Sequence, residues 1–271
     1  MSDLELIKRL AEFNLQVQLG INIDKYQDFE NYRLVYSDKI KDEWYNYVTN
    51  IKSSNKEDFY RIFEEGTAKL KAMGRAPSIC VSPIMEEQYN NRLEYFNDDE
   101  FKVVSQEVWQ VFEAFDKVDE IETKCQYKIE LEKASNMDEY ADALIRAYRT
   151  GESDDPYGNL DPVYKDAYAK YVNNKENLND DFFIVKAEGV PVGITRGSYN
   201  DEFYGIYGIA INIKYRGKGI GKEVIKKQLQ DCRDKNLKMA FLQTEYGYYP
   251  ADLYRKIGFR DVCIEYIYTK K

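Results

Sequence analysis

Apolar residues recur along this chain with two periods, and these periods predict a mixture of helices and strands. Spacings of three and four residues predict helices over residues 4–19, 55–74, 86–95, 136–151, 162–172, 219–235 and 251–259. Alternating or continuous apolar runs predict strands over 32–37, 44–51, 79–81, 101–112, 127–131, 182–187, 192–199, 203–213, 239–243 and 262–268. We therefore expect an α/β (α+β) fold.

The stretch Tyr207–Lys222 joins the strand over 203–213 to the helix over 219–235. Isoleucine alternates at 209, 211 and 213, and glycine then occupies 217, 219 and 221. Glycines let backbone N–H groups converge on an anion, and the positive end of the following helix adds to the attraction. The stretch predicts a phosphate-binding loop, and the alternative is a glycine-rich turn without a ligand.

Spacing separates the known kinds of phosphate loop. A Walker loop needs four residues between its first glycine and its Gly-Lys and then Ser or Thr, whereas three residues and Glu223 stand here. The dinucleotide fingerprint Gly-x-Gly-x-x-Gly is not matched either. The remaining pattern, Arg216-x-x-Gly219-x-Gly221, resembles the pyrophosphate loop of the GNAT acyltransferase superfamily, whose cofactor is acyl-coenzyme A.

A second segment near the C-terminus carries the same resemblance. Leu253-Tyr254 followed by Gly258-Phe259 is similar to the closing helix of that family. The resemblance covers residues 127–271 and implies a GNAT fold with a mixed, mostly antiparallel sheet. It also implies that the strand over 203–213 bulges, as its interior Gly205 and Gly208 suggest, and splays from the next strand to leave a slot for the cofactor. Three departures from the family pattern are Ile213, Gly247 and Pro250.

The first part of the chain repeats the element order of a GNAT half but has no glycine loop. Residues 51–56 contain Ser-Ser-Asn where such a loop would stand, and residues 116–126 are polar and charged like a domain junction. We predict a degenerate GNAT-like domain over 1–122 and a GNAT acetyltransferase domain over 123–271. An unrelated α+β scaffold is the alternative for the first part.

Composition excludes several kinds of function. The formal net charge of -9 argues against a general nucleic-acid binder. The chain has no histidine, which excludes Ser-His and Cys-His nucleophiles. Its four cysteines form no Cys-x-x-Cys pair, so neither a metal site nor a disulfide framework is expected. No run approaches the roughly 20 apolar residues of a membrane span, so we expect a cytoplasmic protein.

The resemblance implies transfer of an acetyl group from acetyl-coenzyme A to a primary amine of a small molecule or peptide. It places a general acid at Tyr254 and a backbone oxyanion donor at Ile211. The base is open between Glu202 and Tyr207, with Asp201 and Glu245 as further alternatives. The residues expected to hold coenzyme A are Ile211, Ile213, Arg216, Gly217, Lys218, Gly219, Ile220, Gly221 and Lys222.

Three matters stay open at this stage. The acidic loop Glu152–Asp155 either receives a cationic substrate or is a solvated loop. A protein that kept the loop but lost its base would be a non-catalytic coenzyme A sensor or assembly module, and this is the alternative to an enzyme. The protein is expected to be a monomer or a homodimer.

Overall fold

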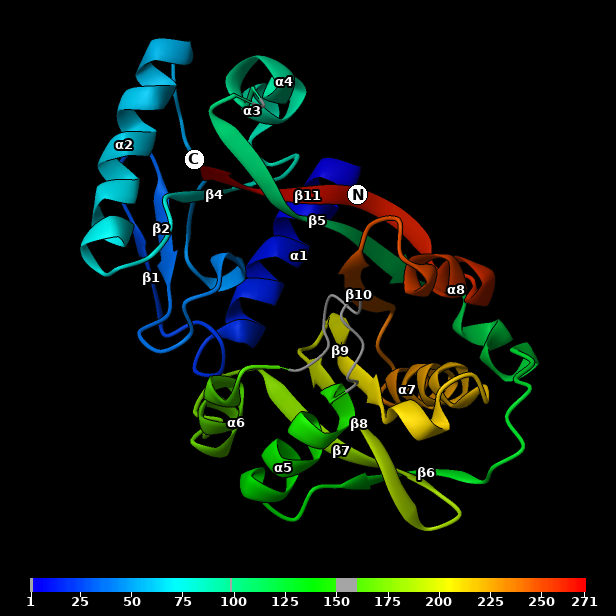
Figure 1. Cartoon of the computed structure of the whole chain (residues 1–271). Coiled ribbons are helices and arrows are strands. Elements are labelled where there is room, and N and C mark those ends of the chain that lie inside the picture. Colours follow the sequence, from blue (N-terminus) through cyan, green and yellow to red (C-terminus); the bar gives the residue numbers. More distant parts are fainter. Residues whose placement is uncertain (1, 98, 150–159) are drawn as a thin grey trace. The chain divides into compact units, whose positions relative to one another are not determined.

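The computed structural model describes residues 2–97, 99–149 and 160–271, and its chain forms two compact units. Unit 1 comprises Met1–Trp109, Gln243–Ala251 and Asp261–Lys271, and unit 2 comprises Gln110–Leu242 and Asp252–Arg260. Each unit combines segments that are distant in the sequence (Figure 1). The units therefore do not coincide with the predicted division between residues 122 and 123, because a strand from the C-terminal end pairs within unit 1.

Unit 1 contains six strands in the order β1-β2-β3-β4-β11-β5. Their bounds are β1 Lys25–Asp28, β2 Arg33–Tyr36, β3 Tyr47–Thr49, β4 Ser78–Val81, β5 Phe101–Phe112 and β11 Arg260–Lys270. β3 and β4 are parallel, whereas β2 pairs antiparallel with β1 and β3, and β11 pairs antiparallel with β4. The helices are α1 Asp3–Gln18, α2 Lys56–Ala72, α3 Glu86–Asn90 and α4 Arg92–Tyr95.

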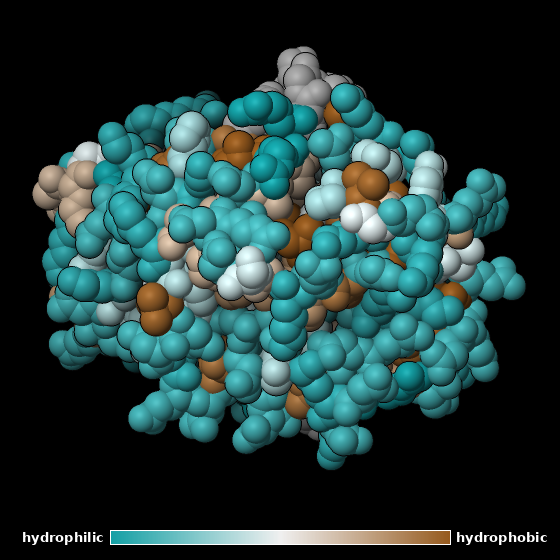
Figure 2. Space-filling view, turned by 90° about the horizontal axis from the view of Figure 1, so that it is seen from below, coloured by the Kyte–Doolittle hydropathy of each residue, from teal (hydrophilic) through white to brown (hydrophobic). Residues whose placement is uncertain are grey.

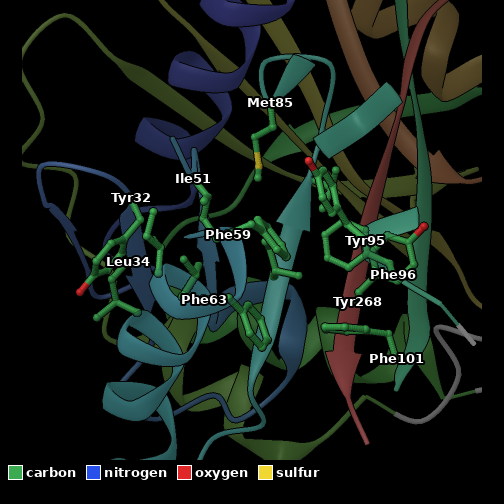
Figure 3. Close-up of a cluster of buried hydrophobic side chains, with 14 of the residues drawn as sticks. Tyr32, Leu34, Ile51, Phe59, Phe63, Met85, Tyr95, Phe96, Phe101 and Tyr268 are labelled. Atoms are coloured by element: carbon green, nitrogen blue, oxygen red, sulfur yellow. The ribbon is translucent and has the colours of Figure 1, made fainter. Parts of the chain in front are cut away.

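Aromatic side chains fill the core of unit 1 (Figure 3). Phe59 and Phe63 of α2 point toward the strands, and Phe59 stacks on Tyr95 with ring centroids 5.2 Å apart. Phe96 stacks on Tyr268 of β11 at 4.5 Å. Because aromatic rings bury the largest apolar areas, these contacts tie the C-terminal strand to the N-terminal helices.

Unit 2 carries the predicted glycine loop. Its strands lie in the order β10-β9-β8-β7-β6, where β10 is parallel to β9 and the other pairs are antiparallel. Their bounds are β6 Ile129–Lys133, β7 Asn179–Ala187, β8 Val190–Tyr199, β9 Phe203–Ile211 and β10 Met239–Glu245. The helices are η2 Phe115–Glu120, α5 Met137–Tyr148, α6 Pro162–Ala169, η3 Ile213–Tyr215, α7 Ile220–Asp234 and α8 Tyr249–Ile257. In Figure 1, α5 and α6 lie on one side of these strands and α7 on the other.

The predicted fold class is confirmed, and most helix bounds agree within a few residues. The strand predicted over 44–51 is wrong at its start, where Glu43–Tyr45 form a 3-10 turn. The buried Asn46 amide holds this turn by donating to the carbonyls of Ile40 and Asp42. The helix predicted over 86–95 is interrupted at Asn91, and β1 was not predicted at all.

Other observations bear on the predictions from composition. All four cysteines are free, and Cys125 is more exposed than the other three. None of the described helices is long and apolar enough to cross a membrane. The face in Figure 2 is mostly hydrophilic, with scattered hydrophobic residues.

Candidate functional site

Strand β9 separates from β10 after Gly205 and bulges against β8 farther along. The glycine pattern predicts the bulge, and the family resemblance implies the separation. The register between β8 and β9 shifts by one residue between the pairs Ile194↔Ala210 and Arg196↔Tyr207. Gly208 lies in this bulge with φ of +60°, a conformation that favours glycine. The last pair between β9 and β10 is Gly205↔Phe241, although β9 continues to Ile211. The edge of β9 beyond Gly205 is therefore not paired with β10.

The loop that follows β9 presents unused backbone donors. Within the described residues, no hydrogen bond uses the N–H groups of Gly217 to Lys222, and no side chain caps α7. Gly217 and Lys218 are exposed, and a Cβ added at Gly217 or Gly221 would meet no atom within 4 Å. The loop thus faces solvent, and its N–H groups and the positive end of a four-turn helix suit an anion.

Contacts from both sides hold this loop in place. The Asn212 side chain accepts from the N–H of Lys214 and starts the short helix η3. Arg216 Nε donates to the carbonyl of Ile211 at 2.9 Å, which fixes the guanidinium against the end of β9. Lys218 Nζ lies 5.6 and 5.2 Å from the ring centroids of Tyr127 and Tyr215. These interactions orient two of the predicted cations beside the free N–H groups.

Residues 119–125, which we call the α7 strap, run along the length of α7. Asp119 accepts from Arg233 and Gln230, and Lys226 donates to the backbone of the strap. Near the loop, Thr123 donates to Glu223 at 2.5 Å. Gly219 has φ of +78°, and a Cβ there would lie 2.9 Å from the N atom of Cys125. Gly219 therefore permits close packing, whereas the other two loop glycines leave open space.

The N–H of Ile211, predicted as the oxyanion donor, points to the open edge of β9. The N–H of Asn212 donates to the carbonyl of Val192 on β8. Successive residues of a strand direct their N–H groups to opposite edges. The N–H of Ile211 therefore points to the edge of β9 that β10 has left. Ile213 belongs to η3 and precedes the cation-bearing part of the loop.

The predicted acid, Tyr254, lies on the face of unit 2 that carries α7. Its side chain packs against a hydrophobic cluster that includes Ile206, Leu229 and Ile257. Its ring lies 5.9 Å from that of Phe259, and its carbonyl accepts from the N–H groups of Gly258 and Phe259. Tyr254 thus lies within α8 and packs against the same cluster as Ile206 of β9.

The two residues predicted as bases occupy different places. Glu202 precedes β9 at the end where β9 and β10 are still paired. Tyr207 lies two residues beyond the last pair, where the strands separate. Burial raises the pKa of the Tyr207 phenol well above its ordinary value, so it is a poor base near neutral pH. Tyr207 thus lies closer to the point where the strands separate, whereas Glu202 has a carboxylate, which suits a base better than a phenol does.

A buried ion pair supports the strands next to Tyr207, and sequence reasoning missed it. The side chains of Arg196 on β8 and Asp180 on β7 are each 1% exposed, and Arg196 Nη2 lies 2.6 Å from Asp180 Oδ1. Asp180 also accepts from Ser198 and Tyr171, and the guanidinium lies 5.6 Å from the centroid of the Tyr207 ring. Nearby positive charge and these hydrogen bonds lower the pKa of Asp180 despite its burial.

Two further predictions concern the acidic loop and a metal site. Glu152–Asp155 lie outside the described residues, so their contact with substrate is not addressed. Among the described residues, no group of three acidic or cysteine side chains could hold a metal ion.

Comparison with known proteins agrees with this geometry. Residues 137–259 match the model of the acetyltransferase (GNAT) family, a span that contains β9, the glycine loop, α7 and Tyr254. No match was found among curated proteins.

Several solved structures have a similar fold. A functionally unknown conserved protein from Staphylococcus epidermidis is 16% identical with a TM-score of 0.65, covering 94% of this chain and 96% of its own. A GCN5-related N-acetyltransferase from Kribbella flavida is 14% identical with a TM-score of 0.63, covering 97% and 94%. A tandem GNAT protein from the clavulanic acid biosynthesis pathway is 10% identical with a TM-score of 0.59, covering 88% and 77%.

Proposed function

We propose that this protein transfers an acetyl group from acetyl-coenzyme A to a primary amine, because residues 137–259 match the model of the acetyltransferase (GNAT) family. The observation that carries the proposal is the row of unused N–H groups from Gly217 to Lys222, beside the point where β9 leaves β10. The row suits the diphosphate of coenzyme A, and the unpaired edge of β9 suits the amides of its pantetheine arm.

The residues present fit this cosubstrate in charge and in space. Gly217 and Gly221 leave open space above the loop, and Arg216 and Lys218 are held beside it. Within this arrangement the Ile211 N–H stabilises the negative charge that develops on the thioester oxygen as the amine attacks. A preorganised donor of this kind contributes about 3 kcal/mol to lowering the barrier. The Tyr254 hydroxyl supplies a proton to the departing thiolate.

The amine must be neutral when it attacks, and each pH unit below its pKa costs about 1.4 kcal/mol. Glu202 or Tyr207 would take its proton directly or through water. The raised pKa of Tyr207 and the position of Glu202 also favour a second candidate function. In that case the protein binds coenzyme A without turnover, as a sensor or an assembly module.

A pair of substitutions at Gly221 tests the binding step. Gly221 lies in the first turn of α7 with nothing within 4 Å of an added Cβ, so a side chain fits there. Gly221→Asp stabilises the helix N-terminus by about 0.5 kcal/mol but repels a diphosphate. We expect it to abolish coenzyme A binding in calorimetry, while the nearly isosteric Gly221→Asn keeps most of the affinity. Equal affinities for the two variants would contradict the proposal.

Thiol release from acetyl-coenzyme A with a panel of amines then separates the enzyme from the sensor. Tyr254→Phe removes only the hydroxyl, and we expect kcat to fall at least tenfold while coenzyme A affinity is retained. Tyr249→Phe is the matched control, since Tyr249 is 76% exposed. Binding of coenzyme A without thiol release for any amine would support the sensor.

A further inference from the structure

Three carboxylates lie near one another on strands of unit 1, the unit that lacks the glycine loop. Glu107 lies on β5, Glu265 on β11, and Glu245 at the end of β10, in the part of that strand that belongs to unit 1. The charges of Glu265 and Glu245 both act on the Glu107 carboxyl. All three residues are partly exposed, so a ligand in solution can reach them. We call these residues the acid cluster.

The acid cluster lacks a compensating cation. Neither Glu107 nor Glu265 forms an ion pair with a lysine or an arginine within the described residues. The other groups that face these two acids are an acid, two thiols and a phenol, namely Glu245, Cys80, Cys263 and Tyr47. Arg33, which acts on Tyr47, is itself paired with Asp28 and Glu12. Negative charge at the cluster therefore has to be neutralised by a proton or by a bound cation.

A buried hydroxyl group points into the acid cluster. Ser105 of β5 is 2% exposed, and its Oγ has no hydrogen-bond partner within 3.5 Å among the described residues. It is directed toward the Glu245 carboxyl. A buried polar group without a partner is unfavourable. An N–H donor bound at the cluster would satisfy the Ser105 oxygen as well as the carboxylates.

The arrangement of the carboxylates favours an organic cation over a metal ion. A metal ion needs several ligand atoms that converge on one point. Among the residues that the structure describes, no group of three acidic or cysteine side chains could hold such an ion. An alkylammonium group has three N–H donors that point in different directions, so it can reach carboxylates that do not converge.

The turn after Glu245 offers aromatic surface next to these acids. Tyr246 and Tyr248 are 46% and 42% exposed. The N–H of Tyr246 donates to the carbonyl of Gln106 at 2.7 Å, which holds the turn beside the neighbour of Glu107 in the chain. Because aromatic rings attract cations and also cover alkyl chains, such a turn suits an aliphatic amine.

Strand β10 leads from the proposed reaction to the acid cluster. Phe241 is the last residue of β10 that pairs with β9, and Glu245 follows four residues later on the same strand. The strand that borders the separation from β9 therefore carries one of the three acids.

We propose that Glu107, Glu245 and Glu265 bind one ammonium group of a dicationic amine, a diamine or polyamine, and that an amine of this class is the acetyl acceptor. The identity of the acceptor rests on the proposed function, whereas binding of the dication does not. The bound ammonium keeps its proton and forms no new bond. The second nitrogen attacks the acetyl carbon, a C–N bond replaces the C–S bond, and the proton that this nitrogen loses balances the one that the thiolate gains.

Binding of a dication should strengthen as the pH rises from 6 to 8.5. Burial and mutual repulsion raise the pKa of Glu107 to about 8, and burial raises that of Glu265 to about 7, so both are largely protonated at pH 6. An alkylammonium group keeps its proton over this range, because its pKa lies near 10. Only the ionised carboxylates attract it, and its charge in turn favours their ionisation.

Calorimetry with 1,4-diaminobutane on the full chain, without coenzyme A, tests the site. We expect saturable binding at pH 8.5 that is at least tenfold tighter than that of 1-aminobutane and at least tenfold tighter than at pH 6. Glu107→Gln and Glu265→Gln should each weaken it at least tenfold, whereas Glu30→Gln, which removes an exposed acid elsewhere in unit 1, should not change it. Equal binding of the two amines, or unchanged binding in both cluster variants, would overturn the proposal.

Thiol release from acetyl-coenzyme A then tests the acceptor class. We expect 1,4-diaminobutane to exceed 1-aminobutane at least tenfold in kcat/KM, and Glu107→Gln to remove the difference through KM. If the diamine binds as described but no amine releases thiol, the cation site stands and the proposed function fails. If thiol is released equally with both amines, the proposed function stands and the acceptor class is refuted.

Discussion

Replacing Glu107 with glutamine should stabilise unit 1 at alkaline pH. Glu107 lies on β5, where burial and the carboxylates of Glu265 and Glu245 raise its pKa to about 8 from a usual 4.5. Burial also raises the pKa of Glu265 to about 7, partly offset by a hydrogen bond with the Cys80 thiol. The folded unit therefore favours the protonated form of both acids, whereas the unfolded chain ionises them near pH 4.5.

The sign and size of the effect follow from this difference. A pKa that is higher in the folded state contributes stability below about pH 4.5 and loses it as the pH rises toward 8. The three to four units at Glu107 correspond to an upper limit of about 5 kcal/mol. Glu107 is partly exposed, so solvent screening reduces this figure, and we expect about 2 kcal/mol. Glu107→Gln stays neutral and avoids the loss.

Tryptophan fluorescence during urea unfolding measures this effect in unit 1. The only two tryptophans of the sequence, Trp44 and Trp109, belong to that unit. At pH 8.5 the free energy of unfolding of Glu107→Gln should exceed that of the unsubstituted protein by about 2 kcal/mol, and at pH 5 the two should nearly agree. The exposed Glu30→Gln serves as control. A Gln variant that is no more stable at pH 8.5 would refute the reasoning.

Other substitutions test the framework of the site. Gly219→Ala should lower the melting temperature and weaken coenzyme A binding, because φ is +78° and the new methyl meets the strap backbone, at a cost of about 1–2 kcal/mol; an unchanged melting curve would contradict this. Asp180→Asn leaves the Arg196 charge buried and should cost about 3–5 kcal/mol in urea unfolding; a loss under 1 kcal/mol would show that the pair is not needed. Tyr140→Phe removes a buried hydroxyl that has no hydrogen-bond partner among the described residues and should be neutral or stabilising, whereas Tyr204→Phe breaks hydrogen bonds to Gln228 and Asp231 and should cost about 1–2 kcal/mol. Equal unfolding free energies for these two variants would refute the hydrogen-bond assignment.

Local sequence signals predicted the parts of the fold that depend on neighbouring residues. Glycine at positions 208 and 217 predicted a bulge and a turn, and both residues have a positive φ there. Gly205 did not behave in this way. It lies within the regular pairing, and a Cβ added there would lie only 2.3 Å from the Tyr207 ring. A glycine in a strand thus predicts either a bulge or a close approach, and only the register distinguishes them.

Long-range pairing was beyond the sequence. Arg196 and Asp180 come together because β7 and β8 pair with Asp180 opposite Ser198 and Phe182 opposite Arg196, which makes the two charged residues diagonal neighbours. A charged residue in a strand gives no sign of its partner. The pairing of β11 with β4 joins residues that are nearly 190 positions apart, so no local pattern marks it. Residues 116–126 resembled a domain junction because they are polar and rich in charge. Part of this segment, the α7 strap, nevertheless forms hydrogen bonds with α7.

Titration of coenzyme A into the purified chain tests the central claim most directly. The account predicts a saturable heat of binding that weakens as salt increases, disappears in Gly221→Asp and persists in Gly221→Asn. The absence of heat with the unsubstituted protein, or full binding by Gly221→Asp, would contradict it.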